Sequence, residues 1–413
     1  MEFETWWLVL IPLIFSLGWM AARLEKRSDA SVRGQLPASY FKGVNFLLSE
    51  QPDKAIDAFL EVAAIDTHTV ELHFALANLF RKKGEIDRAI RVHQFLTTRE
   101  QITPADREKA TYELGVDFLR AGILDRAEQA FTSLSGSNMK AEASRQLLEL
   151  YELEKAWDKA IAQAHKLREY GADVPAGDIA HFYCELAAQF IDAGDLLKAK
   201  AELQNALLTD AQNVRASLLL GDIYFTQHQF DEAIGQWRAA ERQNPWYLPL
   251  VGPNMWAAFK KLERDEEGIA ALLEYCTMYP SIDLLLVLAQ AVEETKGPFA
   301  AFELLREQVR ARPSLLGLDK LLEHQLRGKL DDDRMQDLRL TRELISKHTQ
   351  RLGRYRCQSC GFQAKKFYWQ CPGCANWDSI VPRRAEELDF YPVSAKKAAP
   401  VVTNSPAKIQ ANI

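Results

Sequence analysis

The stretch GDIYFTQHQFDEAIGQWRAAERQNP, residues 221–245, carries the pattern that decides the fold. Gly221 is followed twelve residues later by Ala233 and, four residues after that, by the large side chain of Trp237. In a helical hairpin, two small residues let the helices approach closely, and a large one fills the gap beside them. One hairpin cannot bury its apolar face alone, so the stretch predicts an all-α stack of several such hairpins.

Seven further copies of this spacing, at steps of 33 to 39 residues, indicate a repeat array rather than an unrelated helical bundle. The copies are Gly43/Ala55/Phe59, Ala77/Ala89/His93, Gly115/Ala127/Phe131, Leu148/Ala160/Ala164, Ala187/Ala199/Leu203, Trp256/Gly268/Leu272 and Ala289/Ala301/Leu305. The copies that begin at Leu148 and Trp256 fit loosely, and the copy that begins at Ala77 ends on the polar residue His93. Prolines fall at the ends of several repeats, at Pro245, Pro280 and Pro313. The pattern resembles the tetratricopeptide repeat and predicts a superhelix of about eight helix pairs over residues 36–314.

The helices of a pair are separated by turn signals that contain a glycine, at Gly84, Gly122 and Gly194. Arrays of this kind present a concave groove to their partners. Candidate partner-binding residues on the first helices of the pairs are Phe74, Asn78, Arg81, Tyr112 and Arg120. Two single cysteines inside predicted helices, Cys184 and Cys276, are expected to be small core residues rather than reactive thiols.

Motifs of the common catalytic classes are missing from the sequence. It contains no G-x-x-x-x-G-K-[ST] phosphate loop, no G-x-S-x-G elbow and no H-E-x-x-H motif. The eight histidines are scattered, with no pair at the i, i+4 spacing of one helix face. The net charge of −6 argues against a general nucleic-acid binder. We therefore expect a binding protein rather than an enzyme.

The N-terminus reads as a membrane anchor. Residues 6–22, WWLVLIPLIFSLGWMAA, carry no charge and as a helix would span roughly 26 Å, the short end of what crosses a bilayer. A cleaved signal peptide would place basic residues ahead of this run, but Glu2 and Glu4 stand there and basic residues follow from Arg23 onward. A buried core helix is the other alternative. We expect an uncleaved transmembrane anchor in residues 1–22, a basic linker in 23–35, and the bulk of the chain in the cytoplasm.

Four of the six cysteines form two C-x-x-C pairs near the C-terminus, Cys357/Cys360 and Cys371/Cys374. In such knuckles, backbone amides point at the sulfurs, and glycines such as Gly361 and Gly373 supply a positive φ. Two knuckles face to face place four thiolates in a tetrahedron that suits one zinc or iron ion. A reducing cytoplasm disfavours disulfides. We expect residues 351–384 to form a small domain that depends on its metal for folding. The ten residues between Cys360 and Cys371 are enough for a short hairpin and no more.

The aromatic residues of this segment are expected to pack around the metal, in a unit that resembles a small rubredoxin fold. They are Tyr355, Phe362, Phe367, Tyr368, Trp369 and Trp377. A zinc ribbon for nucleic acid is the rival interpretation, because basic residues flank the site. These residues are Arg354, Arg356, Lys365, Lys366, Arg383 and Arg384. They could equally contact lipids, the repeat array or a protein. With a negative net charge, no nucleic-acid partner is expected.

The remaining segments connect or extend these parts. Residues 315–350 are expected to form one or two amphipathic connector helices, with a helix start at Asp331 to Asp333. Residues 385–413, rich in Pro, Ala, Ser and Lys, are expected to form a disordered tail.

The order of anchor, helical repeats and C-terminal knuckles resembles the lipopolysaccharide assembly protein B family (LapB, also called YciM) of Gram-negative bacteria. The resemblance runs from WWLVLIPLIFSLGW at the start to YRCQSCGF and WQCPGCANW at the end, and it is most specific in the knuckles. The metal cysteines of that family correspond to Cys357, Cys360, Cys371 and Cys374.

The resemblance implies a single-pass inner-membrane adaptor that limits lipopolysaccharide synthesis. Family members promote degradation of the deacetylase LpxC by the membrane protease FtsH, and the family is linked to gathering lipopolysaccharide assembly proteins at the membrane. An alternative from a different class is a membrane-anchored redox or metal-sensing protein that uses a rubredoxin-type centre. The sequence leaves open iron against zinc and whether the chain forms homo-oligomers.

Overall fold

The computed structural model describes residues 70–100, 102–327, 332–351 and 355–384, together with several single positions between residues 42 and 58. The predicted anchor, linker and tail lie outside the described residues. Among the described helices, none combines the length and apolar character needed to cross a bilayer.

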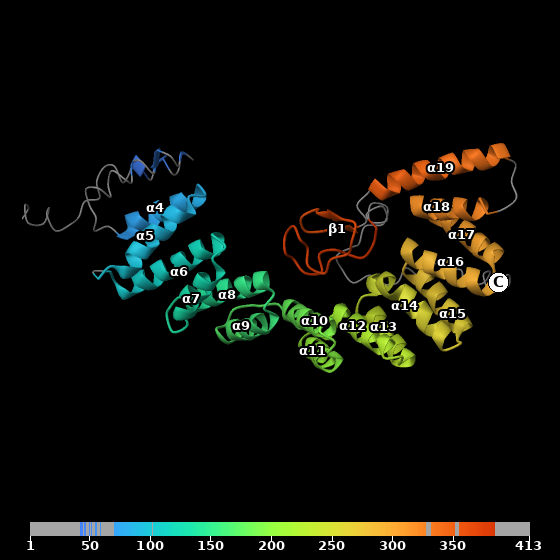
Figure 1. Cartoon of the computed structure of the whole chain (residues 1–413), viewed down its shortest axis with the longest axis horizontal. Helices are drawn as coiled ribbons and strands as arrows, with labels where there is room; N and C mark the ends of the chain where they lie inside the picture. The colour runs from blue at the N-terminus through green and yellow to red at the C-terminus, as the bar shows by residue number, and fades with distance from the viewer. Residues whose placement is uncertain are drawn as a thin grey trace, which may run out of the picture. The chain divides into compact units, whose positions relative to one another are not determined.

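The chain divides into two compact units, Met1–Lys155 and Ala156–Ile413, called unit 1 and unit 2 below. Unit 1 is built from antiparallel helices joined by short turns (Figure 1). Its described helices are α4 (Val70–Lys82), α5 (Ile86–Thr98), α6 (Pro104–Arg120), α7 (Leu124–Ser133) and α8 (Lys140–Glu154). The division falls inside the predicted array, between α8 and the first helix of unit 2, where the copy of the repeat around Leu148 is loose.

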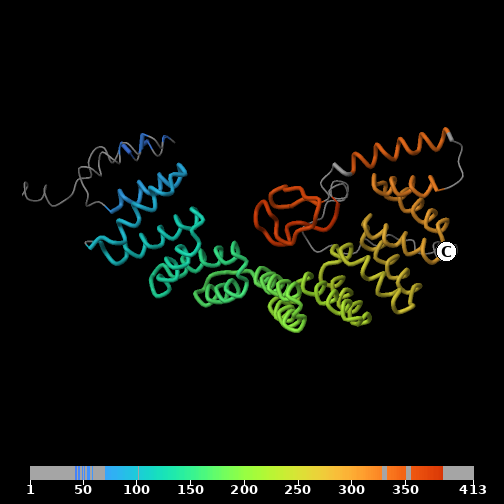
Figure 2. Tube along the Cα trace, viewed as in Figure 1, coloured from blue at the N-terminus to red at the C-terminus, as the bar shows by residue number. Residues whose placement is uncertain are grey.

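Unit 2 continues the hairpin pattern and adds a small module with two short strands, drawn in red in the tube trace (Figure 2). Its first helices are α9 (Trp157–Glu169), α10 (Ala176–Asp192), α11 (Leu196–Thr209), α12 (Val214–Thr226), α13 (Phe230–Gln243) and the 3-10 turn η1 (Pro245–Tyr247). They are followed by α14 (Leu248–Lys261), α15 (Asp265–Met278), α16 (Ile282–Lys296), α17 (Pro298–Ala311), α18 (Leu315–Gln325) and α19 (Asp332–Arg351). The strands are β1 (Tyr355–Arg356) and β2 (Gln363–Ala364).

The predicted glycine turns are confirmed. Gly84, Gly122 and Gly194 have φ values of 81°, 74° and 82°, a left-handed conformation that a β-carbon disfavours. In two other hairpins, His228 and Glu263 adopt the same conformation, with φ of 61° and 55°. These hairpin turns therefore contain a residue in the left-handed conformation even where that residue is not glycine.

The packing predicted from residues 221–245 is also confirmed. Trp237 is fully buried, and its indole nitrogen donates a hydrogen bond to the carbonyl of Leu218 at 3.3 Å. A β-carbon added to Gly221 would overlap the indole ring, so only glycine fits there. Gly115 meets Phe131 in the same way, with 2.6 Å between an added β-carbon and the ring.

One looser copy of the repeat packs differently from the expectation. Gly268 faces Phe259, and an added β-carbon there would lie 2.9 Å from the Phe259 β-carbon, so Trp256 is not the residue that meets this glycine. Trp256 is buried, and its indole nitrogen donates to Glu294 Oε2 at 3.1 Å on the next hairpin. The large Trp256 side chain thus links neighbouring hairpins.

The connector forms two helices, α18 and α19. They are joined by Arg342, which pairs with Asp319 at 3.3 Å and with Glu323 at 2.8 Å. The helix α19 begins at Asp332, in agreement with the predicted start. The metal domain, residues 355–384, follows this helix in the chain.

Candidate functional site: a four-cysteine metal centre docked on the repeats

The four knuckle cysteines converge in the metal domain. Their sulfur atoms all lie within 4.8 Å of one another. Cys357 Sγ is 3.8 Å from Cys374 Sγ, and Cys360 Sγ is 3.7 Å from Cys371 Sγ. A zinc ion bound at about 2.3 Å by four tetrahedral thiolates would separate the sulfurs by about 3.8 Å. The four residues therefore fit one tetrahedral ion, and this sulfur set suits iron or zinc.

Backbone amides point at the sulfurs, as predicted. The amides of Ser359 and Cys360 hydrogen-bond to the Cys357 sulfur, and the Gly373 amide lies 3.4 Å from Cys371 Sγ. Gly361 takes the predicted positive φ, at 78°. The prediction for Gly373 is wrong, because Ala375 adopts the left-handed conformation in the second knuckle, with φ of 56°. Gly373 instead provides space, since an added β-carbon would lie 3.4 Å from Cys360 Sγ.

The paired strands of the metal domain lie at the knuckles themselves. The strands β1 and β2 pair antiparallel across the first knuckle, with Tyr355 opposite Ala364. A single bridge between Gln370 and Trp377 closes the second knuckle. Each knuckle is thus the tip of its own hairpin, because a C-x-x-C turn reverses the chain direction.

The thiols differ in their ease of ionisation. Burial acts to raise the pKa of Cys357, but the Ser379 hydroxyl and the backbone amides outweigh it and lower the pKa to about 6. The Asn376 amide acts to lower the pKa of Cys374, yet burial and the other sulfurs raise it to about 12. Four adjacent thiolates need a cation to offset their repulsion, and a bound metal ion would supply that charge and cross-link the two knuckles.

Only part of the aromatic set packs around the centre. Tyr355 and Phe367 lie against Cys357, Cys371 and Ile380 in the small core of the metal domain. Phe362 and Tyr368 are exposed. Trp369 meets the Phe367 ring at 5.0 Å inside the metal domain and also stacks on the repeats. The expectation is wrong for Trp377, whose ring contacts among the described residues are with the repeats.

The stacking of Trp377 on His181 fixes one side of the metal domain. The two rings lie 4.7 Å apart between centroids and are inclined by 8°. The next residue, Asp378, places Oδ2 at 2.7 Å from His181 Nε2. His181 is buried on α10. A neighbouring pair of aromatic residues, Trp157 and Phe182, meets the Trp377 ring at 6.3 and 6.2 Å.

Trp369 forms a second contact of the same kind. Its ring stacks on Tyr247 with 5.1 Å between centroids and 5° between planes. The guanidinium of Arg215, on α12, lies 5.6 Å from the Trp369 ring and pairs with Glu185 at 2.8 Å. Burial and the nearby carboxylate of Asp378 raise the pKa of Tyr247, so its hydroxyl stays neutral.

Two arginines at the end of the metal domain complete the docking. Arg384 pairs with Asp283 on α16 at 2.8 Å, and Arg383 lies 4.4 Å above the ring of Trp246. These two basic residues therefore contact the repeats. Lys365 and Lys366 are exposed, and Arg354 lies outside the described residues. The domain is bound by α10, α12, η1 and α16, that is, by several consecutive hairpins.

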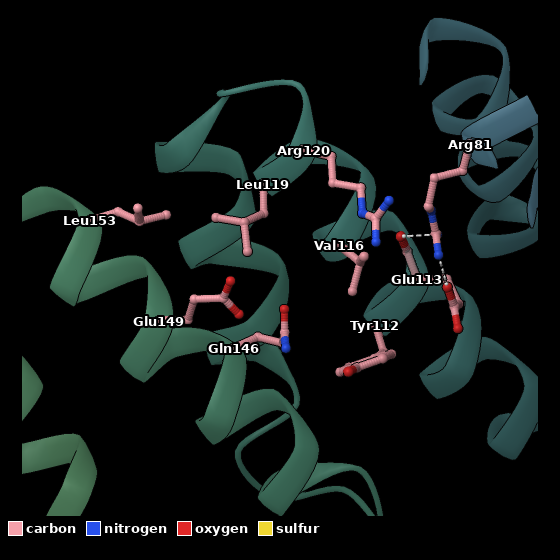
Figure 3. Close-up of a pocket in the computed structure, with 9 residues that line it drawn as sticks. All are labelled: Arg81, Tyr112, Glu113, Val116, Leu119, Arg120, Gln146, Glu149 and Leu153. Carbon is pink, nitrogen blue, oxygen red and sulfur yellow. Dashed lines mark hydrogen bonds and ion pairs between the residues drawn. The ribbon is translucent and has the colours of Figure 1, made fainter. Parts of the chain in front are cut away.

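The predicted groove residues lie on α4 and α6 of unit 1, but they differ in exposure. Arg81, Tyr112 and Arg120 line one concavity of about 450 Å³ (Figure 3). Asn78 is exposed outside that lining. Phe74 is buried among Leu96, Ile102 and Ala110, so it contributes packing rather than surface. Here the sequence pattern did not distinguish core from groove.

The sequence did not identify the docking residues of the array. His181, Arg215, Tyr247 and Asp283 belong to separate hairpins and share no spacing that would mark them. The single cysteines, in contrast, are confirmed as core residues. Burial raises the pKa of both Cys184 and Cys276 to about 12.

These features define a tetratricopeptide-repeat protein that carries a docked metal domain of the rubredoxin type. Two family models agree: residues 355–382 match the rubredoxin metal binding domain and residues 190–245 match the tetratricopeptide repeat. The lipopolysaccharide assembly protein B of Escherichia coli K12 is 33% identical over 378 residues, which cover 91% of this chain and 97% of that protein. The Haemophilus influenzae protein of the same name is 31% identical and covers 92% and 98%. The chain belongs to the lipopolysaccharide assembly protein B family.

Solved structures add a weaker likeness. The structure of Naa15/Naa10 bound to HypK-THB matches with 14% sequence identity and a TM-score of 0.43, covering 75% of this chain and 46% of that one. At this TM-score, the likeness supports no conclusion about function.

Proposed function

We propose that this chain acts in lipopolysaccharide assembly as an adaptor, held at the inner membrane by residues 1–22 with its bulk in the cytoplasm. The name of its relatives, lipopolysaccharide assembly protein B, supports a role in this process. The observation that carries the adaptor role is the docking of the metal domain across several hairpins through Trp369, Trp377 and Arg384. This contact makes one composite surface from two parts that are far apart in the sequence.

The adaptor brings the deacetylase LpxC to the membrane protease FtsH and so limits lipopolysaccharide synthesis. Binding both proteins on one anchored scaffold converts their encounter into an intramolecular step, with an effective concentration in the millimolar range for short tethers. Such a gain needs no chemistry from the adaptor itself. The same surface would gather other lipopolysaccharide assembly proteins.

The metal has a structural role in this proposal. Cys357, Cys360, Cys371 and Cys374 hold one iron or zinc ion, and the ion cross-links the knuckles that precede Trp377. A domain with so small a core depends on its metal for folding. Loss of the ion would therefore unfold the metal domain and break the contacts of Trp369, Trp377 and Arg384 with the repeats.

The test is the abundance of LpxC in cells. Depletion of this chain is expected to raise LpxC, and the substitutions Cys371→Ser and Cys374→Ser are expected to reproduce the rise. Cys276→Ala is the matched control, because this cysteine lies in the repeats and binds no metal. Unchanged LpxC on depletion would refute the adaptor proposal.

A second candidate function, electron transfer or redox sensing, is favoured by one observation. Cys360 is exposed, whereas Cys357 and Cys371 are buried, so one edge of the sulfur cluster is open to solvent. An absorption spectrum of aerobically purified protein separates the two functions. A reversible iron–thiolate band would support this candidate, and a colourless zinc protein would exclude it.

A further inference from the structure

The concavity of unit 1 has a rigid wall built on a buried ionic network. Arg81 Nε lies 2.5 Å from Asp117 Oδ1, and the same guanidinium lies 2.7 Å from Glu113 Oε2. Asp117 is fully buried, and its second oxygen lies 2.6 Å from Nδ1 of the equally buried His93. Because its guanidinium is held by two carboxylates, Arg81 shapes the wall and is not free to pair with a ligand.

Three aliphatic side chains form the floor of a concavity whose other lining residues are mostly polar. Val116 and Leu119 on α6 and Leu153 on α8 line it, and Leu153 is 63% exposed. A large apolar side chain left this exposed in a concavity offers surface to a ligand, since covering it removes apolar area from water. The volume of about 450 Å³ falls within the range of about 300–1,000 Å³ typical of ligand pockets.

Four polar side chains that line the concavity have no hydrogen bond or ion pair within the described residues: Tyr112, Arg120, Gln146 and Glu149. Figure 3 shows Arg120 and Glu149 on opposite sides of Val116 and Leu119, with Gln146 beside Glu149. A glutamine side chain both donates and accepts, which matches the amide of an extended peptide. Arg120 offers a partner for a carboxylate, and Glu149 offers one for a cationic group.

We propose that this concavity binds an extended peptide segment of a partner protein in which a large apolar side chain stands between an acidic and a basic residue. The apolar side chain covers Val116, Leu119 and Leu153. The acidic residue pairs with Arg120 and the basic residue with Glu149. This site would be one of the surfaces through which the adaptor recognises a partner. Its role in the cell rests on the adaptor proposal.

The test uses the full-length chain in detergent and two fluorescent peptides, Gly-Gly-Asp-Leu-Lys-Gly-Gly and Gly-Gly-Lys-Leu-Asp-Gly-Gly, measured by anisotropy. One order of charges is expected to bind more tightly, because the pocket charges lie on fixed sides. Arg120→Glu or Glu149→Arg alone should weaken that peptide about tenfold, because each reversal removes one ion pair and adds a repulsion between like charges. The double variant Arg120→Glu/Glu149→Arg should favour the opposite order. Replacing Leu by Gly in the peptide should abolish binding.

The matched control is Arg145→Glu/Glu154→Arg, which makes the same exchange at exposed positions of α8 outside the concavity. This variant should bind as the unmodified chain does. Binding of neither peptide, or equal binding by the double variant and the control, would overturn the inference. If neither peptide binds but depletion of the chain still raises LpxC, the peptide site is wrong and the adaptor proposal stands. If a peptide binds as predicted but depletion leaves LpxC unchanged, the peptide site stands and the adaptor proposal is wrong.

Discussion

The indole of Trp377 stacks on the imidazole of His181, with 4.7 Å between ring centroids, and this contact joins the metal domain to the helix α10 of the repeats. The neighbouring Asp378 carboxylate meets the same imidazole at 2.7 Å. One short segment after the last metal ligand therefore provides both an aromatic and a polar contact. Because Trp377 stands three residues after Cys374, we expect the contact to depend on the state of the metal site.

Replacing Trp377 by alanine is expected to release the metal domain from α10. Trp377 is partly buried, and a tryptophan that anchors an interface typically contributes about 2 kcal/mol or more. Hydrogen exchange of peptides covering residues 178–187 should become faster, while the metal content stays at one ion per chain. Tyr368→Ala is the control, because this aromatic residue of the same domain is exposed. Equal exchange in both variants would show that the stacking does not hold the domain.

The number of reactive thiols is expected to change in steps. At pH 8, a thiol with a pKa of about 12 is ionised in only about one molecule in 10⁴, and the thiolate is the reacting species. Cys184 and Cys276 should therefore stay unmodified in the native protein. Chelation of the metal should unfold the metal domain, so its four thiols, Cys374 included, lose the surroundings that shift their pKa. Titration with an aromatic disulfide reagent should then count four thiols after chelation and six after denaturation. Six reactive thiols in the folded, metal-loaded chain would contradict this account of the core.

Two glycines are expected to respond oppositely to the same substitution. Gly221→Ala should destabilise unit 2 by about 2–3 kcal/mol, because the new methyl group overlaps the Trp237 indole. Gly235→Ala should stabilise it by about 0.5–1 kcal/mol, because this helical glycine has open space around it. Thermal unfolding of the two variants measures both effects. A loss of stability at both positions would mean that helix packing does not distinguish them.

Local patterns predicted most of the fold. The pairing of Gly221 with Trp237 and the turn at Gly84 depend on residues close in sequence, so spacing alone was sufficient. The glycine pattern missed the turns in which a residue other than glycine adopts the left-handed conformation. His228 and Glu263 adopt the left-handed conformation at a cost of about 1–2 kcal/mol, which packing of the flanking helices must offset.

The metal ligands were predictable for the same reason, and the docking surface was not. Each C-x-x-C pair is a local turn, so its role can be read from its spacing. Trp369 and Trp377 were expected to pack around the metal, but their partners Tyr247 and His181 lie on separate hairpins. No periodicity separates these two from other buried aromatic or histidine residues. Such a contact depends on the three-dimensional path of the chain.

The lifetime of LpxC in cells tests the central claim most directly. Cells depleted of the native chain would be supplied with the unmodified protein, the Cys371→Ser/Cys374→Ser variant, Trp377→Ala or Tyr368→Ala, and LpxC would be followed after synthesis is stopped. We predict rapid loss of LpxC with the unmodified chain and Tyr368→Ala, and slow loss with the metal-site variant and Trp377→Ala. Equal LpxC lifetimes in all four strains would contradict an adaptor whose surface depends on the docked metal domain.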